Sequence, residues 1–438
     1  MNERANQSDL VSWLREASPY VHAHRGQICV VYLSGAAVAG PNLEHHVYDL
    51  ALLVGLGLKV VLVHGIRPQL EERLARVGVD SRVVRGIRIT DAEVLPHVID
   101  ACGTVRARIE ARLSQGVLNS PMSGAKLSVA GGNYVTARPV GVLHGVDYAF
   151  TGEVRRVDAA AARRRLDDGE LLLLSPLAFS PSGESFNLDA SALATDVAIA
   201  LAAPKLVFVS ESGPIRLDEG ELVHEVTGRD GRDLLERSSG PSRQLLERAL
   251  RACQQGVGRV HVVDHATDGA LLLELFSRDG VGSLISATPF DRMRRATPDD
   301  VSGIIALIAP LETEGTLVRR SRDLIEREID RFFVVTRDEA VVGCAALHPF
   351  PEAEVAELSC IAVDPQYGAR GFGSALLRQL ETTARSGGAR SVFVLTTRAA
   401  DWFKQQGFVA TTVEALPVTR KQIYNQQRNS QVLTKALG

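Results

Sequence analysis

The stretch from residue 354 to residue 377 most restricts the folds open to this chain, because it joins a strand, a glycine-rich turn and a helix. Its first ten residues, EVAELSCIAV, are mostly apolar and β-prone, which predicts a buried strand. Asp364-Pro365 ends this strand, since proline has no N–H to donate to a neighbouring strand. A glycine-rich turn before a helix presents backbone N–H groups at the positive helix end, which predicts an anion-binding site. The glycines of the turn are Gly368, Gly371 and Gly373.

Two familiar phosphate-binding turns do not fit this stretch. A P-loop is excluded, because no Gly-Lys-Ser or Gly-Lys-Thr follows the glycines. A dinucleotide fingerprint fits poorly, since the turn is long and no acidic residue follows at the required distance. By its residues alone, the stretch also remains compatible with a plain glycine-rich turn of an α/β domain.

Length and composition narrow the class of protein. A chain of 438 residues exceeds one ordinary core and predicts two domains, and a net charge of −3 gives no reason to expect nucleic-acid binding. The apolar runs are too short or too interrupted to span a bilayer, and the N-terminus MNERANQSDL lacks an apolar signal core. We therefore expect a cytoplasmic protein without nucleic-acid or membrane partners. Cysteines 29, 102, 253, 344 and 360 are scattered and mostly lie in apolar segments, which predicts reduced core residues and no metal site.

From residue 28 to residue 288 apolar strands alternate with helices. Alternation at this spacing predicts an α/β fold with a mostly parallel sheet covered by helices on both faces. Ahead of it, residues 8–24 predict an amphipathic helix with a break or kink at Pro19. The expected strands are 28–33, 59–65, 82–89, 126–130, 170–175, 205–210 and 259–264, with helices between them that include 43–58, 190–202 and 242–255.

A second α/β domain is expected after a link at residues 286–296. Thr297-Pro298-Asp299-Asp300 predicts a helix start, with a cap, a proline at the first position and acids at the positive helix end. The expected elements are strand 290–295, helix 299–309, a hairpin over 332–350, strand 354–363, helix 373–386, strand 391–397, helix 399–408 and strand 431–437.

The run from Gly368 to Gly373 resembles the acetyl-CoA signature of the GCN5-related N-acetyltransferases, Gln/Arg-x-x-Gly-x-Gly/Ala, with Gly368 replacing the leading Gln or Arg. The element order after residue 290 and the Trp-Phe-x-x-x-Gly-Phe run at 402–408 also resemble that family. The resemblance implies acetyl-CoA as co-substrate, with its pantetheine arm on strand 354–363 where the strand splays from its neighbour. It assigns the cofactor to Cys360, Ile361, Ala362, Val363, Gly368, Ala369, Arg370, Gly371, Phe372, Gly373 and Ser374.

The first two-thirds of the chain resemble the amino-acid kinase family, in particular acetylglutamate kinase. The matching stretches are VVYLSGAAV (30–38), VVLVHGIRPQL (60–70), FNLDASALATDVAIAL (186–201) and KLVFVSESGP (205–214). Because phosphoryl transfer needs lysine charges and a close backbone approach to the phosphates, we expect the kinase fold without kinase chemistry. The departures are Tyr32 for the first lysine, Gly65-Ile66-Arg67 for the glycine triplet, Ser191 for the aspartate and Pro241-Ser242-Arg243 for Pro-Lys.

Residues 259–285 resemble the arginine-binding segment of arginine-inhibited acetylglutamate kinases and bacterial N-acetylglutamate synthases. This resemblance implies that Glu274 takes the guanidinium of arginine and Lys205 its carboxylate. Tyr20 and the backbone of Gly280 and Gly282 complete the implied site. By its position alone, Glu274 could equally be a solvated charge on an amphipathic helix.

The run YNQQRNSQVL (424–433) is similar to one found in the N-acetylglutamate synthases. The resemblance implies that the Val318 backbone, Arg320, Arg428 and Ser430 bind glutamate, with two arginines for two carboxylates. It also makes Glu357 the proton acceptor for the amine and Thr396 a donor to substrate or thiolate. By residue type alone, Glu357 could be an edge charge on the polar face of its strand, and Thr396 merely a β-prone residue.

Together these resemblances imply an amino-acid N-acetyltransferase that uses acetyl-CoA and L-glutamate in the first step of arginine biosynthesis and is inhibited by L-arginine. The expected parts are an N-terminal helix (1–26), an inactive kinase-like domain that binds arginine (27–286) and an acetyltransferase domain (287–438). The resemblance further implies a ring-like homo-hexamer. Two alternatives remain, an acetylglutamate kinase with an appended acetyltransferase and a non-catalytic arginine sensor.

Overall fold

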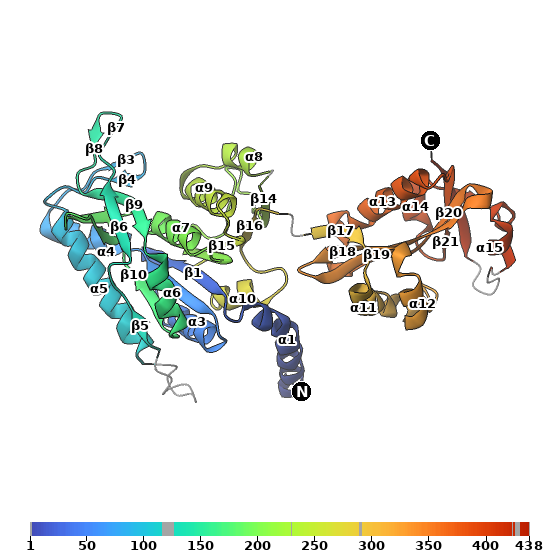
Figure 1. Cartoon of the computed structure of the whole chain (residues 1–438), viewed down its shortest axis with the longest axis horizontal. Helices are drawn as coiled ribbons and strands as arrows, with labels where there is room; N and C mark the ends of the chain where they lie inside the picture. The colour runs from blue at the N-terminus through green and yellow to red at the C-terminus, as the bar shows by residue number, and fades with distance from the viewer. Residues whose placement is uncertain are drawn as a thin grey trace. The chain divides into compact units, whose positions relative to one another are not determined.

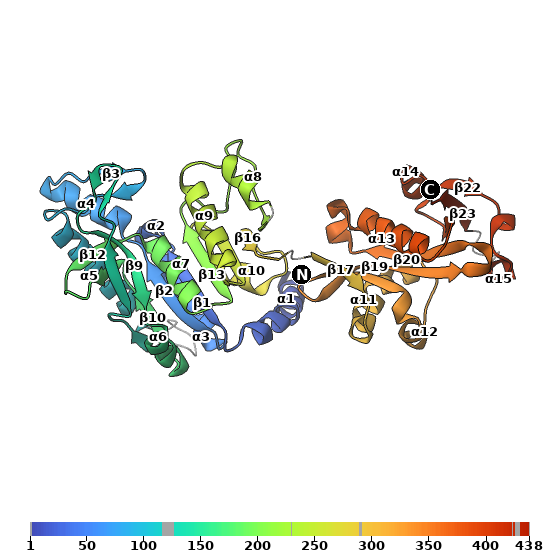
Figure 2. The same cartoon turned by 45° about the horizontal axis from the view of Figure 1, so that its top comes forward.

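The computed structural model describes residues 2–115, 127–228, 230–288, 291–422, 424 and 430–437. The chain divides into two compact units, Met1–Thr288 and Pro289–Gly438, each with its own sheet (Figures 1 and 2). The predicted substrate residue Arg428 lies outside the described residues. Among the described helices, none combines the length and the apolar character needed to cross a membrane. All five cysteines lie in the described part of the chain and are buried free thiols, as predicted.

The described residues of the first unit form an eight-stranded sheet with β1 (Ile28–Leu33) inside it. β1 pairs in parallel with β2 (Lys59–His64) on one side and with β13 (Lys205–Ser210) on the other. Among the described neighbours, the antiparallel pair is β15 with β16, so the predicted mostly parallel sheet is confirmed. The outer strands are β10 (Leu171–Leu174), β5 (Val129–Ala130), β15 (Arg259–Asp264), β16 (Ser283–Ser286) and β14 (Glu225–Thr227).

Strand β1 is apolar at every position because its side chains enter two cores. Ile28 and Val30 join the core that includes side chains of α7 (Ala190–Ala200) and α9 (Gly240–Gln254). Val31 and Leu33 join the core that includes side chains of α3 and α5 on the other face. The other helices of this unit are α2 (Gly35–Ala39), α3 (Leu43–Gly55), α4 (Arg67–Val77), α5 (Leu95–Leu113), α6 (Ala159–Asp167), α8 (Gly231–Glu236) and α10 (Ala270–Phe276).

Helix α1 (Asn2–His24) begins earlier than predicted and passes through Pro19, so the predicted break there is wrong. Pro19 has no N–H for the carbonyl of Arg15, but both residues are exposed, and water can satisfy that carbonyl. The C-terminal end of α1 packs on α10, where Nε2 of His24 lies 2.8 Å from the Leu275 carbonyl (Figures 1 and 2).

Residues 82–89, predicted as one strand, form a hairpin instead. Its turn residues Arg85 and Gly86 both have left-handed φ angles, 52° and 78°, which reverse the chain within two residues. The short strands of this hairpin are β3 (Val83–Val84) and β4 (Ile87–Arg88).

Residues 135–188 include a small closed barrel that the alternation pattern did not reveal. Its strands are short and partly exposed, so they carry little of the periodic apolar signal that identifies a strand from sequence. The barrel strands are β6 (Val135–Pro139), β9 (Thr151–Val157), β11 (Leu177–Phe179) and β12 (Ser185–Leu188), and a hairpin of β7 (Val142–Leu143) and β8 (Val146–Asp147) adjoins them.

The described residues of the second unit form a seven-stranded sheet in the order β17-β18-β19-β20-β21-β23-β22. Neighbouring strands are antiparallel except for β20 with β21, which are parallel, and the predicted element order is confirmed. The strands are β17 (Asp291–Arg295), β18 (Phe332–Arg337), β19 (Ala340–Phe350), β20 (Val355–Val363), β21 (Ser391–Thr396), β22 (Val409–Thr411) and β23 (Gln431–Ala436).

Helices lie on both faces of this second sheet (Figure 1). Alternate side chains of β19 explain the arrangement, since Ala345 and Leu347 pack on the side of α13, and Cys344 and Ala346 pack on the side of α11. The helices are α11 (Val301–Thr313), α12 (Arg322–Arg327), α13 (Phe372–Ser386), α14 (Ala400–Gln405) and α15 (Val418–Gln422).

Candidate functional site

The central strands of the second unit separate part of the way along their length. β20 pairs with β21 from Val355 to Leu358, opposite Ser391 to Val394. Beyond Leu358, the described strands show no further β20–β21 pairs, although β21 stays paired with β23 as far as Thr396. Backbone groups of residues 359–363 therefore line an opening of the kind that an extended ligand can fill by strand-like hydrogen bonds.

A bulge in β20 accompanies this separation. The register between β19 and β20 shifts between Cys344 and Ala346, and Cys360 opposite this shift has a left-handed φ of 53°. A bulge bends a strand and increases its twist, which turns the end of β20 away from β21. The predicted cofactor residues Cys360, Ile361, Ala362 and Val363 all lie on this bent end.

The glycine-rich turn follows directly. Residues 365–370 form a 3-10 turn, and Gly371, with a φ of 75°, leads into α13. Within the described residues no side chain caps this helix start, so the N–H groups of its first turn point out of the helix. The side chain of Trp402 lies 3.4 Å from where a Cβ on Gly373 would stand, so the predicted Trp-Phe segment packs against the turn. The turn and the open strand edge, where the cofactor is predicted to bind, are therefore neighbours in the structure.

Glu357 lies on β20, one residue before the last β20–β21 pair, and its side chain is only 10% exposed. Arg420 of α15 holds both of its carboxylate oxygens, with Nε to Oε2 at 2.5 Å and Nη2 to Oε1 at 3.0 Å. The alternative of a solvated edge charge is therefore wrong. Arg420 was not predicted from the sequence, because it lies 63 residues further along the chain in a short segment without a motif.

His348 of β19 stands opposite Glu357 in the strand register. Its Nδ1 lies 3.0 Å from Nη1 of Arg331, and since a guanidinium can only donate, Nδ1 is the acceptor. Burial lowers the pKa of His348, with Glu328 and Glu357 opposing the shift and Arg331 and Arg320 adding to it. At neutral pH the ring is thus uncharged and carries its hydrogen on Nε2.

Thr396, the last residue of β21, is buried, and its hydroxyl accepts a hydrogen bond from the Ala399 N–H at 2.9 Å. A hydroxyl that accepts one bond can still donate its own proton. Gln431, the strand partner of Thr396, follows Ser430, so the structure brings Thr396 and Ser430 to the same end of β21 and β23.

The other predicted substrate residues lie in the segment between α11 and α12. Nη1 of Arg320 donates to the Val318 carbonyl at 3.2 Å, and the Arg320 N–H donates to Glu312 at 2.9 Å. The charge of Arg320 contributes to the lowered pKa of His348. Ser430 is buried, and its carbonyl accepts from the Tyr424 hydroxyl at 2.7 Å.

In the first unit, Glu274 of α10 is buried, and both of its carboxylate oxygens have hydrogen-bond partners. Its Oε2 accepts from the N–H groups of Val281 (2.7 Å) and Gly282 (2.8 Å), and its Oε1 lies 2.6 Å from Nδ1 of His261. Burial opposes ionisation, but the His261 hydrogen bond and the two backbone N–H groups outweigh it and lower the pKa of Glu274. The alternative of a solvated helix charge is therefore wrong, and the partner His261 was not predicted from the sequence.

The glycines after α10 are required by this arrangement. A Cβ on Gly280, whose φ is 62°, would collide with the Glu274 carboxylate, and a Cβ on Gly282 would collide with the Val262 carbonyl. Lys205 is buried at the start of β13, and its positive charge contributes to the lowered pKa of His261. Tyr20 lies one helical turn before His24 on α1, whose end packs on α10. The predicted arginine-site residues therefore lie on adjoining elements.

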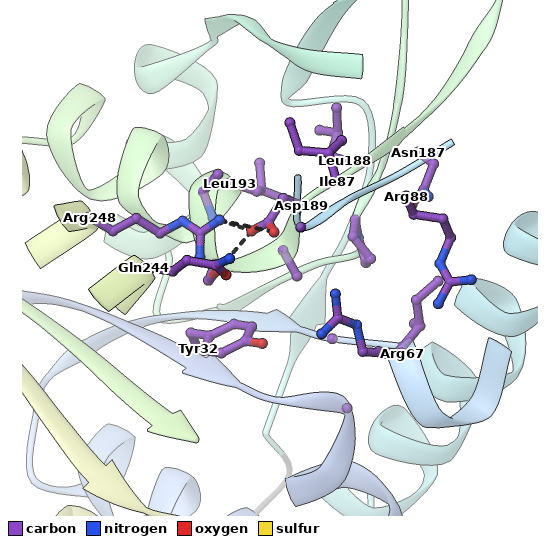
Figure 3. Close-up of a pocket in the computed structure, with 18 of the residues that line it drawn as sticks. Tyr32, Arg67, Ile87, Arg88, Asn187, Leu188, Asp189, Leu193, Gln244 and Arg248 are labelled. Atoms are coloured by element: carbon purple, nitrogen blue, oxygen red, sulfur yellow. Dashed lines mark hydrogen bonds and ion pairs between the residues drawn. The ribbon is translucent and has the colours of Figure 1, made fainter. Parts of the chain in front are cut away.

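A cavity of about 520 Å³ lies at the carboxyl ends of β1, β2 and β13 in the same unit (Figure 3). Tyr32 and Arg67 point toward its middle, where a kinase would need a lysine and bare glycine backbone. Asp189 pairs with Arg248 at 3.0 Å and accepts from the Ser191 hydroxyl at 2.7 Å. The described lining of this cavity therefore has Tyr32 and Arg67 where the kinase resemblance predicts a lysine and a glycine.

Fold and site together define an acetyltransferase that carries a kinase-like first unit. Residues 27–264 match the amino acid kinase family, and residues 303–408 match the acetyltransferase (GNAT) family. The chain belongs to the bacterial amino-acid acetyltransferases and is an acyltransferase enzyme, as predicted.

Its relatives match along nearly the whole chain. Amino-acid acetyltransferases of Ectopseudomonas mendocina and Pseudomonas fluorescens are 49% and 50% identical to it, over 98% of this chain and 100% of theirs. N-acetylglutamate synthase from Neisseria gonorrhoeae, solved with coenzyme A and L-arginine, is 36% identical with a TM-score of 0.88, over 98% of this chain and 99% of that one. The same synthase solved with coenzyme A and N-acetylglutamate gives a TM-score of 0.62.

Proposed function

We propose that this enzyme transfers the acetyl group of acetyl-CoA to the α-amino group of L-glutamate, giving N-acetylglutamate and coenzyme A. The observation that carries the proposal is the opening of β20 from β21 after Leu358, beside the glycine turn and the buried Glu357. The similar synthase solved with coenzyme A and N-acetylglutamate supports the same substrates. Release of thiol from acetyl-CoA, measured over a panel of amino acids, tests it.

Acetyl-CoA is expected along the open edge of β20. Its pantetheine amides would pair with backbone groups of residues 360–363, and its phosphates would lie at the N–H groups from Gly371 to Ser374. Arg370 ends the 3-10 turn just before Gly371 and adds positive charge there. The side chain of the predicted residue Ala369 lies outside the described part of the turn.

The reaction removes two protons from the nitrogen and exchanges one C–S bond for one C–N bond. The α-ammonium gives a proton to Glu357, and the freed lone pair forms a C–N bond at the thioester carbonyl carbon. The C–S bond then breaks with its electron pair on sulfur, and the nitrogen loses its second proton to that sulfur, giving the neutral amide and the thiol of coenzyme A. The Thr396 hydroxyl lies at the end of β21 and would donate to the developing negative charge. Val318, Arg320, Arg428 and Ser430 would hold the glutamate.

Gly371→Ala should raise the KM for acetyl-CoA about tenfold. A side chain at the left-handed φ of 75° costs ~1–2 kcal/mol and places a methyl group at the N–H groups of the turn. Gly388→Ala is the matched control, because Gly388 follows the far end of α13, its φ of 87° is also left-handed, and a Cβ there also meets open space. Initial rates against acetyl-CoA concentration measure both, and equal KM values for the two variants would contradict the assignment of the turn.

The second candidate function is that of an acetylglutamate kinase with an appended acetyltransferase. The side chains that line the cavity in Figure 3 are evidence against this function. Tyr32 supplies no charge, burial raises its pKa further from neutral, and Arg67 occupies the phosphate turn. We expect ADP release from ATP and N-acetylglutamate to stay at background. Saturable, acetylglutamate-dependent ADP release would overturn this.

We further propose that L-arginine binds at Glu274, Lys205, Tyr20 and the Gly280 to Gly282 turn and lowers acetyl transfer, as in feedback control of arginine biosynthesis. Support comes from the similar synthase solved with L-arginine and from the gathering of these residues between α1, α10 and β13. A non-catalytic arginine sensor would bind arginine without releasing thiol.

The hexamer and the cytoplasmic location stay predictions. Light scattering of the purified protein tests the hexamer.

A further inference from the structure

Arg420 binds the proposed base Glu357 by two hydrogen bonds. Its Nε donates to Oε2 at 2.5 Å and its Nη2 donates to Oε1 at 3.0 Å, and the side chains of Arg420 and Glu357 are only 19% and 10% exposed. Each carboxylate oxygen has two acceptor sites, so one site on each oxygen is left unused by Arg420. Glu357 therefore keeps the capacity to accept a proton while Arg420 stays bound.

The two bonds restrict the rotation of the Glu357 carboxylate. A glutamate side chain without partners rotates broadly about its last torsion, whereas a guanidinium fork that bonds both oxygens holds the carboxylate in one plane. Proton transfer needs an acceptor oxygen within hydrogen-bond distance of the amine and in line with its N–H. A carboxylate held in one plane meets this requirement in a larger share of encounters than one that rotates.

Apolar packing on both sides of α15 places Arg420 over Glu357. Phe393 is the β21 partner of Glu357 and therefore lies on the same face of the sheet. Leu416, just before α15, is 4% exposed and packs in one cluster with Phe393. Tyr424, just after α15, packs against the same cluster. The short helix is thus anchored at both ends on the sheet face that carries Glu357.

Arg420 also balances the charge of Glu357. A carboxylate with little access to water is costly without a cation beside it. Within the described part of the chain, the hydrogen bonds of the Glu357 side chain come from Arg420 alone. Arg331 bonds to His348, the β19 partner of Glu357. It also pairs with Glu328 at 2.9 Å, so it does not stand in for Arg420.

We propose that Arg420 is a positioning residue that holds the Glu357 carboxylate in one orientation, with one acceptor site of each oxygen left for the ammonium group of the substrate. The inference rests on the proposed function. Arg420 itself takes no proton, because a guanidinium only donates hydrogen bonds and keeps its charge. Its contribution to the reaction therefore passes through Glu357 and is measured in kcat.

A double-mutant cycle of Arg420→Gln and Glu357→Gln tests this role, with thiol release at saturating L-glutamate as the measure of kcat. In the wild-type background, Arg420→Gln should lower kcat about 10- to 100-fold, the cost of a misplaced catalytic group. In the Glu357→Gln background it should lower kcat less than about threefold, because the base through which Arg420 acts is already absent. An equal factor in both backgrounds would show a role independent of Glu357 and overturn the proposal.

Controls separate positioning from a general loss of structure. Arg420→Lys keeps the cation without the fork, so its kcat should lie between wild type and Arg420→Gln, and it carries the cycle if Arg420→Gln fails to bind coenzyme A. Lys421→Gln alters the next residue, whose partner is the surface Glu414, and should behave as wild type. A loss in Lys421→Gln equal to that in Arg420→Gln would assign the effect to α15 as a whole and overturn the proposal. Absence of L-glutamate acetylation in wild type would instead refute the proposed function.

Discussion

The Glu357→Gln variant should acetylate L-glutamate about 10²- to 10⁴-fold more slowly than wild type, the usual contribution of a positioned general base. Glutamine has the volume of glutamate but does not accept the ammonium proton, so the amine keeps no lone pair for attack. Glu357 adjoins the open end of β20 without belonging to the segment assigned to pantetheine. The loss should therefore appear in kcat, with coenzyme A affinity within about twofold of wild type.

Thiol release and isothermal titration with coenzyme A measure these two quantities separately. Glu354→Gln is a suitable control, because Glu354 precedes β20 and pairs with the exposed Arg390. A Glu357→Gln enzyme with a wild-type kcat would remove Glu357 from the mechanism. Loss of coenzyme A binding together with activity would instead show that the Glu357–Arg420 pair is needed to hold the site in shape.

The Glu274→Gln variant should bind L-arginine about 10- to 100-fold more weakly and lose arginine sensitivity to the same degree, with basal acetyl transfer retained. A charged hydrogen bond to a guanidinium is worth ~1.5–3 kcal/mol, and the amide removes the charge. Glutamine is preferred to alanine, because its amide oxygen still accepts from the N–H groups of Val281 and Gly282. Alanine would leave these donors and His261 without their buried partner.

The concentration of arginine that halves thiol release reports this effect. Glu72→Gln is the control, since Glu72 forms a surface pair with Arg76 on α4. If Glu274→Gln responds to arginine as wild type does, arginine binds elsewhere. A fall in basal rate alongside the lost sensitivity would mean that the Glu274–His261 contact also supports the active conformation.

Much of the fold followed from local pattern. The apolar strands of the first unit predicted a parallel sheet covered on both faces. In the structure both faces of β1 are covered, and its side chains pack in two cores. The segment from Glu354 to Gly373 predicted a strand, a turn and an anion-binding helix start, and the left-handed Gly371 provides that turn. The barrel at residues 135–188 escaped prediction, because short and partly exposed strands carry little periodicity.

For the candidate sites too, the sequence determined some features and the tertiary structure decided the others. Sequence alone determined which residue types stand near each other along the chain: the glycine turn, the departures from kinase chemistry at Tyr32 and Arg67, and Glu274 followed by its glycines. Tertiary structure alone decided that Glu357 meets Arg420 across 63 residues and that Glu274 meets His261 across 13. A hydrogen bond needs two groups within about 3 Å in a fixed direction, and periodicity and propensity hold no information about which distant segments fold to that distance.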